Sequence, residues 1–280
     1  MSEKNIGRLT LVGTPIGNLS DVSPRALEAL QATDFIAAED TRVTVHLLNH
    51  FEIKKPLVSY HEHNKRISGQ AICDRLLAGE NGVLVSDAGL PAISDPGEDL
   101  VRMCHEQGIP VGIVPGPCAL VTALALSGMP AGRFTFEGFL SMNKRARRDH
   151  LAEVKNETRT MIFYEAPHKL HATLKDFYAV FGDRPLALVR EITKIHEEVI
   201  RTTLIQAVER FENEAPRGEF VVIVGGAPKV EEVSLTLEQA IALARDIITE
   251  GASPTTAAKQ VAAETGYRKN EIYKGLVEAE

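Results

Sequence analysis

The residues best suited to hold a ligand lie in residues 82–97, with the sequence GVLVSDAGLPAISDPG. Residues 83–85 are apolar without alternation, which predicts a strand buried on both faces of a parallel sheet. Residues 86–91 are small, polar or turn-forming. A helix is predicted next, with an N-cap at Asp95, a proline at its first position and a capping box completed by Glu98. A strand followed by such a loop and a helix indicates a ligand site, although the alternative is a loop that only turns tightly.

Three other strand ends carry similar small-residue loops, at residues 14–18, 115–118 and 164–166. Such loops expose backbone N–H and C=O groups, which suits a flat, mostly neutral ligand between apolar walls. None of them has the lysine of a phosphate-binding loop, and GxGxxG is missing from the first half, which weakens a dinucleotide-binding interpretation. An adenosine with a short amino-acid tail fits this description, and a triphosphate does not.

The densest basic cluster follows a predicted strand at residues 134–139 and comprises Lys144, Arg145, Arg147 and Arg148. The chain has a net charge of −7, so its overall charge does not attract nucleic acid, and any basic surface must be local. Because the cluster stands alone in an acidic protein, it favours contact with phosphates, and we expect it in an exposed loop. The alternative is the solvated start of a helix, which charge runs usually are.

The elements that must position these residues alternate between strand and helix up to about residue 115. This alternation predicts an α/β fold with a parallel sheet and helices on both faces. A second α/β unit is expected over residues 116–226, after the first over residues 8–115, and residues 227–234 are expected to be a polar linker. Residues 235–280 predict three short helices, either a helix-turn-helix-like module or a small helical cap on the body.

Composition limits the classes of protein that fit. The chain has 280 residues, 44% of them hydrophobic, enough for two domains with real cores. Its three cysteines, at positions 73, 104 and 118, show no CxxC spacing, so we expect buried thiols in a reducing compartment and no metal site. Without an apolar N-terminal segment or a run of about 18 apolar residues, a cytoplasmic, soluble protein with no membrane contact is expected.

Seven segments, in order over about residues 8–226, resemble the tetrapyrrole methylase superfamily. They are GTPIGNL, AAEDTR, LVSDAGLPAISDPG, VPGPCA, FEGFL, IFYEAPHKL and REITKIHEE. Within the superfamily they are most similar to the bacterial group of ribosomal RNA small subunit methyltransferase I, and the C-terminal helices resemble the helical extension of that group. One departure is Ser141-Met142, where members usually have a proline. The resemblance implies two α/β domains with mixed or parallel sheets and methyl transfer from S-adenosylmethionine to the ribose 2′-oxygen of a cytidine in 16S ribosomal RNA.

The resemblance also implies a cofactor pocket between the two α/β domains. Carried over by motif, its residues are Pro15, Asp87, Ala88, Gly89, Leu90, Ile93, Cys118, Ala119, Tyr164 and Glu165, with Gly225 as a weaker candidate. The partners implied are ribosomal RNA or the small ribosomal subunit, and a second copy in a homodimer. Phosphate contacts are expected from Arg42, Lys169 and Lys194 besides the basic cluster, which would make RNA binding salt-dependent.

Methyl transfer to a ribose hydroxyl needs in-line approach and help in removing a proton of low acidity. The candidate bases are His61, Asp40, Glu191 and Lys194. Each has a structural alternative: His61 as a helix cap, Asp40 as a turn residue with Arg42, and Glu191 with Lys194 as an ion pair. A lysine base would also have to be desolvated or placed beside another cation.

Two other functions stay open at this point. The same fold could methylate carbon atoms of a tetrapyrrole, although EDTR, SYHEHN, REITKIHEE and the added helices favour RNA. A non-enzymatic nucleic-acid binder that uses the helix-turn-helix is the third hypothesis, although few aromatic residues are present to stack on bases.

Overall fold

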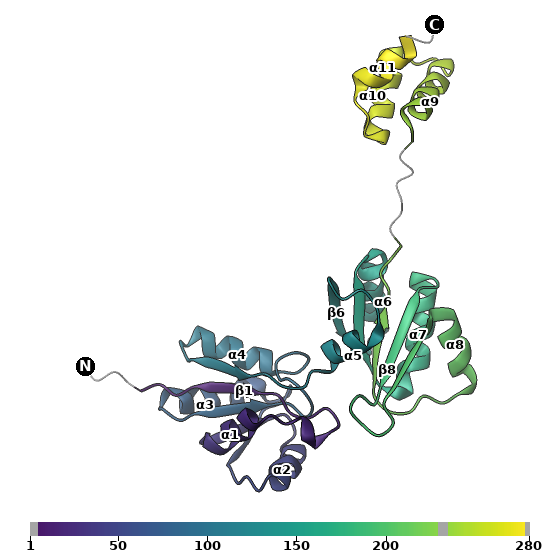
Figure 1. Ribbon diagram of the computed structural model, residues 1–280. Helices are drawn as coiled ribbons and strands as arrows, with labels where there is room; N and C mark the ends of the chain where they lie inside the picture. Colours follow the sequence, from purple (N-terminus) through teal and green to yellow (C-terminus); the bar gives the residue numbers. More distant parts are fainter. Residues whose placement is uncertain (1–4, 229–234, 278–280) are drawn as a thin grey trace. The chain divides into compact units, whose positions relative to one another are not determined.

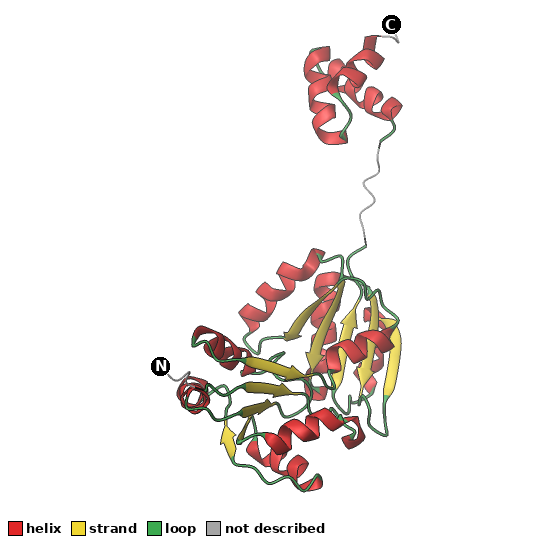
Figure 2. Ribbon diagram, turned by 60° about the vertical axis from the view of Figure 1, so that its left-hand side comes forward, coloured by secondary structure: helices red, strands yellow, loops and turns green. Residues whose placement is uncertain are grey.

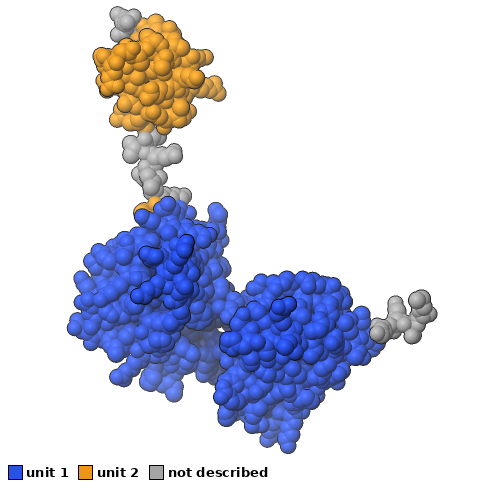
Figure 3. Space-filling model, turned by 180° about the vertical axis from the view of Figure 1, so that it is seen from behind, with its two compact units in different colours: residues 1–227 blue, residues 228–280 orange. Residues whose placement is uncertain are grey.

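The computed structural model describes residues 5–228 and 235–277. The chain divides into two compact units, residues 1–227 and residues 228–280 (Figure 3). The first unit contains both sheets, and the predicted boundary near residue 115 falls inside it, so that division into two α/β domains stays a prediction.

The first sheet is entirely parallel, with strand order β3-β2-β4-β1-β5 (Figure 1). Its strands are β1 (Leu9–Val12), β2 (Phe35–Ala38), β3 (Leu57–Ser59), β4 (Gly82–Val85) and β5 (Val111–Val114). Every residue of β2 and β4 is buried, as expected for strands covered on both faces. The predicted parallel sheet is therefore confirmed.

Helices cover both faces of this sheet. They are α1 (Pro24–Ala32), α2 (Thr41–His50), α3 (Lys65–Leu77) and α4 (Gly97–Glu106). Leu30 of α1 and Leu48 of α2 share one apolar cluster with β2 and β4, and Ile72 of α3 and Leu100 of α4 share the other. The alternating side chains of each strand thus enter two separate cores, which fixes the strand ends that carry the loops.

The second sheet is mixed, with order β6-β7-β10-β8-β9, and only β6 and β7 pair in parallel. Figure 2 draws the strands of both sheets in yellow. Its strands are β6 (Phe134–Phe139), β7 (Thr160–Glu165), β8 (Pro185–Arg190), β9 (Glu198–Thr203) and β10 (Phe220–Val224). Helix α5 (Ala119–Ser127) packs on one face. The helices α6 (Lys144–Glu153), α7 (Pro167–Phe181) and α8 (Leu204–Asn213) share the core on the other. Short 3₁₀ turns, η1 (Leu19–Asp21) and η2 (Val154–Asn156), complete the unit.

The strands expected at residues 83–85 and 134–139 are present as β4 and β6, but several local predictions were wrong. The helices α2 and α8 were not predicted, and the basic cluster opens helix α6 rather than lying in a loop. Asn143 caps α6, because its Oδ1 accepts hydrogen bonds from the N–H groups of Arg145 and Ala146. Helix α4 begins at Gly97 without a side-chain cap, since Asp95 instead accepts from the N–H groups of Ala92 and Gly97 and holds the turn before the helix.

The second unit is a small three-helix domain with its own core. Its helices are α9 (Leu237–Thr249), α10 (Pro254–Thr265) and α11 (Lys269–Val277). A capping box at Thr236 and Gln239 starts α9, and Ser253 caps α10. Buried Ala244, Val261 and Ile272 bring the three helices together. Tyr273 and Val277, which were expected to face inward with Leu276, are instead 41% and 54% exposed, and Ile272 takes the inner position beside Leu276. The predicted linker over residues 227–234 lies mostly outside the described residues. Across the described ranges, no helix has the combination of length and apolar character needed to cross a membrane.

Candidate functional site

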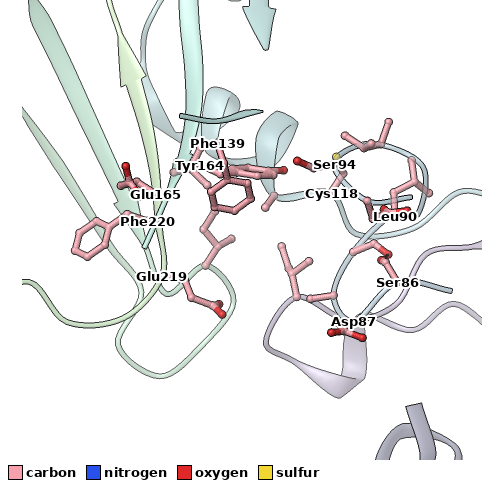
Figure 4. A pocket seen from close by; sticks show the side chains of 18 of the residues that line it. Ser86, Asp87, Leu90, Ser94, Cys118, Phe139, Tyr164, Glu165, Glu219 and Phe220 are labelled. Atoms are coloured by element: carbon pink, nitrogen blue, oxygen red, sulfur yellow. Dashed lines mark hydrogen bonds between the residues drawn. The ribbon is translucent and has the colours of Figure 1, made fainter. Parts of the chain in front are cut away.

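A cavity of about 530 Å³ lies where loops of the first sheet face the second sheet within the first unit (Figure 4). Ser86, Asp87 and Leu90 line it from the loop after β4, and Cys118 lines it from the loop after β5. Tyr164 and Phe220 line it from the second sheet. The loops that the sequence predicts to converge, including Ile16 of the loop after β1, are brought together here.

The loops after β1 and β4 are joined by a pair of reciprocal hydrogen bonds. The N–H of Thr14 donates to the carbonyl of Gly89 at 2.9 Å, and the N–H of Gly89 donates back to the carbonyl of Thr14 at 3.2 Å. The hydroxyl of Ser86 also donates to the Gly89 carbonyl, at 3.1 Å. These bonds fix the shape of this part of the cavity wall.

Gly89 needs to be glycine for two reasons. Its φ is +89°, in a region that residues with a Cβ rarely adopt. A Cβ placed there would lie 3.2 Å from Cγ2 of Ile16, a second residue of the cavity wall. The predicted close approach of backbone to ligand at this loop is therefore compatible with the geometry.

Two aromatic rings form the opposite wall. Tyr164 and Phe139 have ring centroids 5.4 Å apart, and Phe139 is 58% exposed (Figure 4). The Tyr164 hydroxyl accepts a hydrogen bond from the N–H of Leu120, at the start of α5. Burial of the phenol raises the pKa of Tyr164 to about 12, so this residue stays neutral and acts as an apolar surface with a fixed hydroxyl.

Carboxylates supply the charge of the cavity. Glu39, Asp87, Asp95 and Glu219 all line it. The pKa of Glu39 is raised, first by burial and then by repulsion from Asp87 and Asp95. Asp87 is oriented by the N–H of Asp40, which donates to its Oδ1 at 2.9 Å. A cavity with this much negative charge and apolar wall suits a cationic ligand with a flat ring system.

The sequence analysis did not name several residues that line the cavity, among them Glu39, Ser94, Phe139 and Glu219. Glu39 precedes Asp40 at the end of a buried strand, within the motif AAEDTR. The motif therefore indicated a functional carboxylate, but Asp40 was taken as the candidate rather than Glu39. Glu219 faces the cavity because β10 pairs beside β7, a pairing between distant segments that spacing alone does not reveal.

Most predicted cofactor residues meet at the cavity. They are Asp87, Ala88, Gly89, Leu90, Ile93, Cys118, Ala119, Tyr164 and Glu165. Glu165 contributes little of its side chain, since its carboxylate is buried and accepts hydrogen bonds from Thr173 and from the N–H of Ala166 (Figure 4). Two predicted residues do not belong to this wall. Pro15 lines a neighbouring cavity, and Gly225 follows the far end of β10, where its N–H donates to Pro185.

None of the four candidate bases lines the main cavity. His61 lies at the end of β3 in a turn that Asn64 closes. The guanidinium of Arg42 lowers the pKa of Asp40 to about 2, which leaves a poor proton acceptor. Glu191 has its pKa lowered by the N–H of Glu219 and by Lys194. Burial opposes the charge of Lys194, but its bonds to Glu219 and Glu191 outweigh this and raise its pKa, so it is a cation rather than a base.

The candidate phosphate-binding residues separate into two groups. Lys144, Arg145 and Arg148 are exposed on α6. Arg147 instead points inward, with a side chain that is 16% exposed, and binds Asp176 at 2.6 Å and the hydroxyl of Thr173 at 2.9 Å. Arg42 is 88% exposed but pairs with Asp40, and Lys169 is half-buried near the start of α7. The cluster therefore presents three exposed cations rather than four, and one of them, Arg145, lies 3.8 Å from the carboxylate of Asp149.

A family model for tetrapyrrole (corrin/porphyrin) methylases matches residues 8–208. A ribosomal RNA small subunit methyltransferase I from Synechocystis sp. is 45% identical to this chain over 276 residues, 98% of this chain and 99% of that protein. The protein of the same name from Escherichia coli O157:H7 is 44% identical, with 99% and 97% covered.

Solved structures share the fold at lower identity. Uroporphyrin-III-C-methyltransferase from Thermus thermophilus is 20% identical with a TM-score of 0.55, over 79% of this chain and 95% of that one. A complex of the Thermus enzyme with S-adenosyl homocysteine is 18% identical with a TM-score of 0.54, over 78% and 92%. Diphthine synthase, with a TM-score of 0.57, is only 13% identical over 78% and 89%.

Proposed function

The chain belongs to the tetrapyrrole (corrin/porphyrin) methylase family, and from this premise we propose that it is an S-adenosylmethionine-dependent methyltransferase acting on small-subunit ribosomal RNA. The observation that carries the substrate is the set of relatives at 42–47% identity, which include eight proteins named ribosomal RNA small subunit methyltransferase I. The acceptor is the ribose 2′-oxygen of a cytidine.

The tetrapyrrole alternative has weaker support. The solved porphyrinoid methyltransferases are 18–20% identical to this chain, a level that speaks for the fold and not for the substrate. The non-enzymatic alternative has to leave the main cavity without a role, although its volume of about 530 Å³ is ample for a cofactor.

The residues of the main cavity fit S-adenosylmethionine. Its adenine is flat and suits the wall formed by Tyr164 and Phe139, and the carboxylates of Glu39, Asp87 and Glu219 complement a sulfonium and an ammonium group. The loop at Gly89 offers main-chain groups at close range. When bound, the cofactor supplies the methyl carbon: its bond to sulfur breaks as a bond to the ribose oxygen forms, and sulfur keeps the electron pair.

The chain itself has to position the hydroxyl and accept its proton. Glu39 is the best-placed carboxylate, because it lines the cavity and its raised pKa makes it a stronger base than Asp40. Asp87 stands beside it, fixed by the N–H of Asp40, and is suited to orient the attacking oxygen. Tyr164 and Phe139 exclude water from the wall that faces them.

The partner and setting follow from this activity. The exposed Lys144, Arg145 and Arg148 contact RNA phosphates. The substrate is the small ribosomal subunit, and the protein acts in the cytoplasm. It acts as a homodimer, so sedimentation should give twice the mass of one 30.6 kDa chain.

The decisive experiment offers two acceptors to the purified protein with methyl-labelled S-adenosylmethionine. Small ribosomal subunits from a strain that lacks this gene should take up label, and digestion should recover it as 2′-O-methylcytidine. A uroporphyrinoid acceptor should stay unlabelled. Label in the porphyrinoid alone, or in neither acceptor, would overturn the proposal.

A further inference from the structure

A second cavity of about 290 Å³ adjoins the main one in the first unit. Its walls come from the loop after β1, from η1 and from α2, and it shares Ser86 and Asp87 with the main cavity. The two spaces therefore meet at the end of β4. Two reactants held one in each cavity would approach each other at Asp87.

The walls of the second cavity combine apolar surfaces with side chains that mostly accept hydrogen bonds, His46 being the exception. Leu19 and Val43, which are 42% and 43% exposed, form apolar walls together with Leu47. The hydroxyls of Thr14 and Thr44 already donate to backbone oxygens, at 3.3 and 3.2 Å. What each hydroxyl still offers a ligand is a lone pair, and the Asp87 carboxylate likewise only accepts.

Size restricts the occupant further. A volume of about 290 Å³ lies at the lower end of the range for ligand pockets, which suits a single nucleoside and is small for a four-ring macrocycle. Among bases, one that carries an exocyclic amine matches the acceptors of the walls, since an amine only donates. A carbonyl beside Thr14, Thr44 or Asp87 would meet lone pairs, and the side chain that could donate to a carbonyl is the imidazole of His46, which also lines the cavity.

We propose that the second cavity holds the acceptor nucleoside, an amine-bearing pyrimidine, with its ribose at Ser86 and Asp87 where the two cavities meet. This inference rests on the proposed function and adds the position of the substrate and the source of its base preference. Arg42 precedes Val43 in sequence, and its side chain is 88% exposed although it pairs with Asp40, so it is accessible to a phosphate that flanks the nucleoside.

Helix α2 supplies a matched pair of variants. Val43 and Val45 are exposed to similar extents, 43% and 40%, but only Val43 lines the second cavity. Val43→Trp should fill the space, and Val45→Trp should add the same indole outside it. We expect Val43→Trp to lower kcat/KM for small-subunit methylation at least tenfold and Val45→Trp to change it less than twofold. Cofactor affinity, measured by calorimetry, should stay within twofold of wild type in both.

Leu19→Trp fills the same cavity from η1 instead of α2. It keeps the test valid if Val43→Trp fails to fold. The inference fails if Val43→Trp and Leu19→Trp both methylate as well as wild type. It also fails if a variant that melts like wild type loses cofactor affinity, because the cavity would then belong to the methyl donor. A wild-type protein that methylates no ribosomal RNA would instead refute the proposed function, so the two failures are distinguishable.

Base preference gives an independent readout. Subunits in which the target cytidine is replaced by uridine should be methylated at least tenfold more slowly by wild type. Equal rates for the two bases would contradict the acceptor-rich character of the walls.

Discussion

The phenolic oxygen of Tyr164 accepts a hydrogen bond of 3.1 Å from the backbone N–H of Leu120. This bond ties strand β7 to the first turn of α5, where N–H groups have no partner within the helix. The ring of Tyr164 thus reaches the main cavity from a position that two elements define.

Tyr164→Phe should keep the aromatic wall and lose the bond. The N–H of Leu120, a residue only 7% exposed, would then lack this partner, and we expect unfolding free energy to fall by about 1–2 kcal/mol. Tyr178→Phe removes a hydroxyl from a residue that is 38% exposed and should change stability by less than about 0.5 kcal/mol. Denaturant titrations of the two variants make the comparison. Equal stabilities would mean that the bond contributes nothing.

Gly89→Ala should cost stability and cofactor affinity together. Adding a Cβ at φ +89° costs about 1–2 kcal/mol, and contact with Ile16 disturbs the cavity wall. Gly108→Ala is the control, because its φ is +69° but a Cβ there has open space around it. Both variants should melt earlier, and only Gly89→Ala should bind S-adenosylmethionine about tenfold more weakly in calorimetry. Unchanged affinity would remove this loop from the cofactor site.

Glu39→Gln should separate stability from activity. A carboxyl whose pKa is raised by folding binds its proton more tightly in the folded state, so its ionisation weakens the fold as pH rises above about 4.5. The variant should therefore melt at a higher temperature than wild type at pH 7, and this gain should disappear below pH 4. Methylation should fall about 100-fold if Glu39 accepts the proton.

Glu106→Gln, which alters an exposed carboxyl on α4, should change neither property. In wild type, kcat should rise with pH as Glu39 ionises and then level off, and the variant should lack this rise. A pH profile shared by wild type and Glu39→Gln would exclude Glu39 as the proton acceptor.

Replacing Lys144, Arg145 and Arg148 by alanine should weaken RNA binding and flatten its dependence on salt. Each lost phosphate contact should lower the slope of log affinity against log salt by about 0.7–0.9. The control replaces Arg25, Lys54 and Arg66, three exposed cations of the first unit, and removes the same charge. Titrations at several salt concentrations test the difference. Equal slopes in the two triple variants would show that the cluster is only a solvated helix start.

Arg147→Ala should behave differently from its neighbours. Its guanidinium binds Asp176 and Thr173, so we expect a loss of about 1–2 kcal/mol of stability and little change in the salt slope. Thermal melting with RNA titration resolves the two effects. A lower slope without a loss of stability would return Arg147 to the RNA-binding group.

Much of the fold could be predicted because its signals are local. The unbroken apolar run of β4 and the alternation of strand and helix up to about residue 115 mark elements that form as expected. Helix α2 was not predicted, because residues 41–50 are rich in β-branched side chains, which have a low helix propensity. Burial of Thr44 and Leu48 against the sheet outweighs that low propensity.

The parts of the candidate site in loops that follow strands could be predicted from the sequence. The parts that depend on contacts between residues distant in sequence could not. A glycine in the loop after a buried strand, such as Gly89, predicts that the backbone comes close to a ligand there. The pairing of Arg147 with Asp176 joins residues 29 positions apart, and no local pattern distinguishes it from Arg145 or Arg148. Glu39 and Asp40 are adjacent, and only the sheet decides which of the two faces the cavity.

The reciprocal hydrogen bonds between Thr14 and Gly89 have a thermodynamic consequence for ligand binding in the two cavities. Thr14 lines the second cavity and Gly89 lines the main one, so a ligand that displaces either backbone displaces the other. Heterotropic coupling of this kind is reciprocal: whatever factor the first occupant applies to the affinity of the second, the second applies to the first. If the proposed nucleoside in the second cavity raises the affinity of the methyl donor in the main one, the donor raises the affinity of the nucleoside by the same factor.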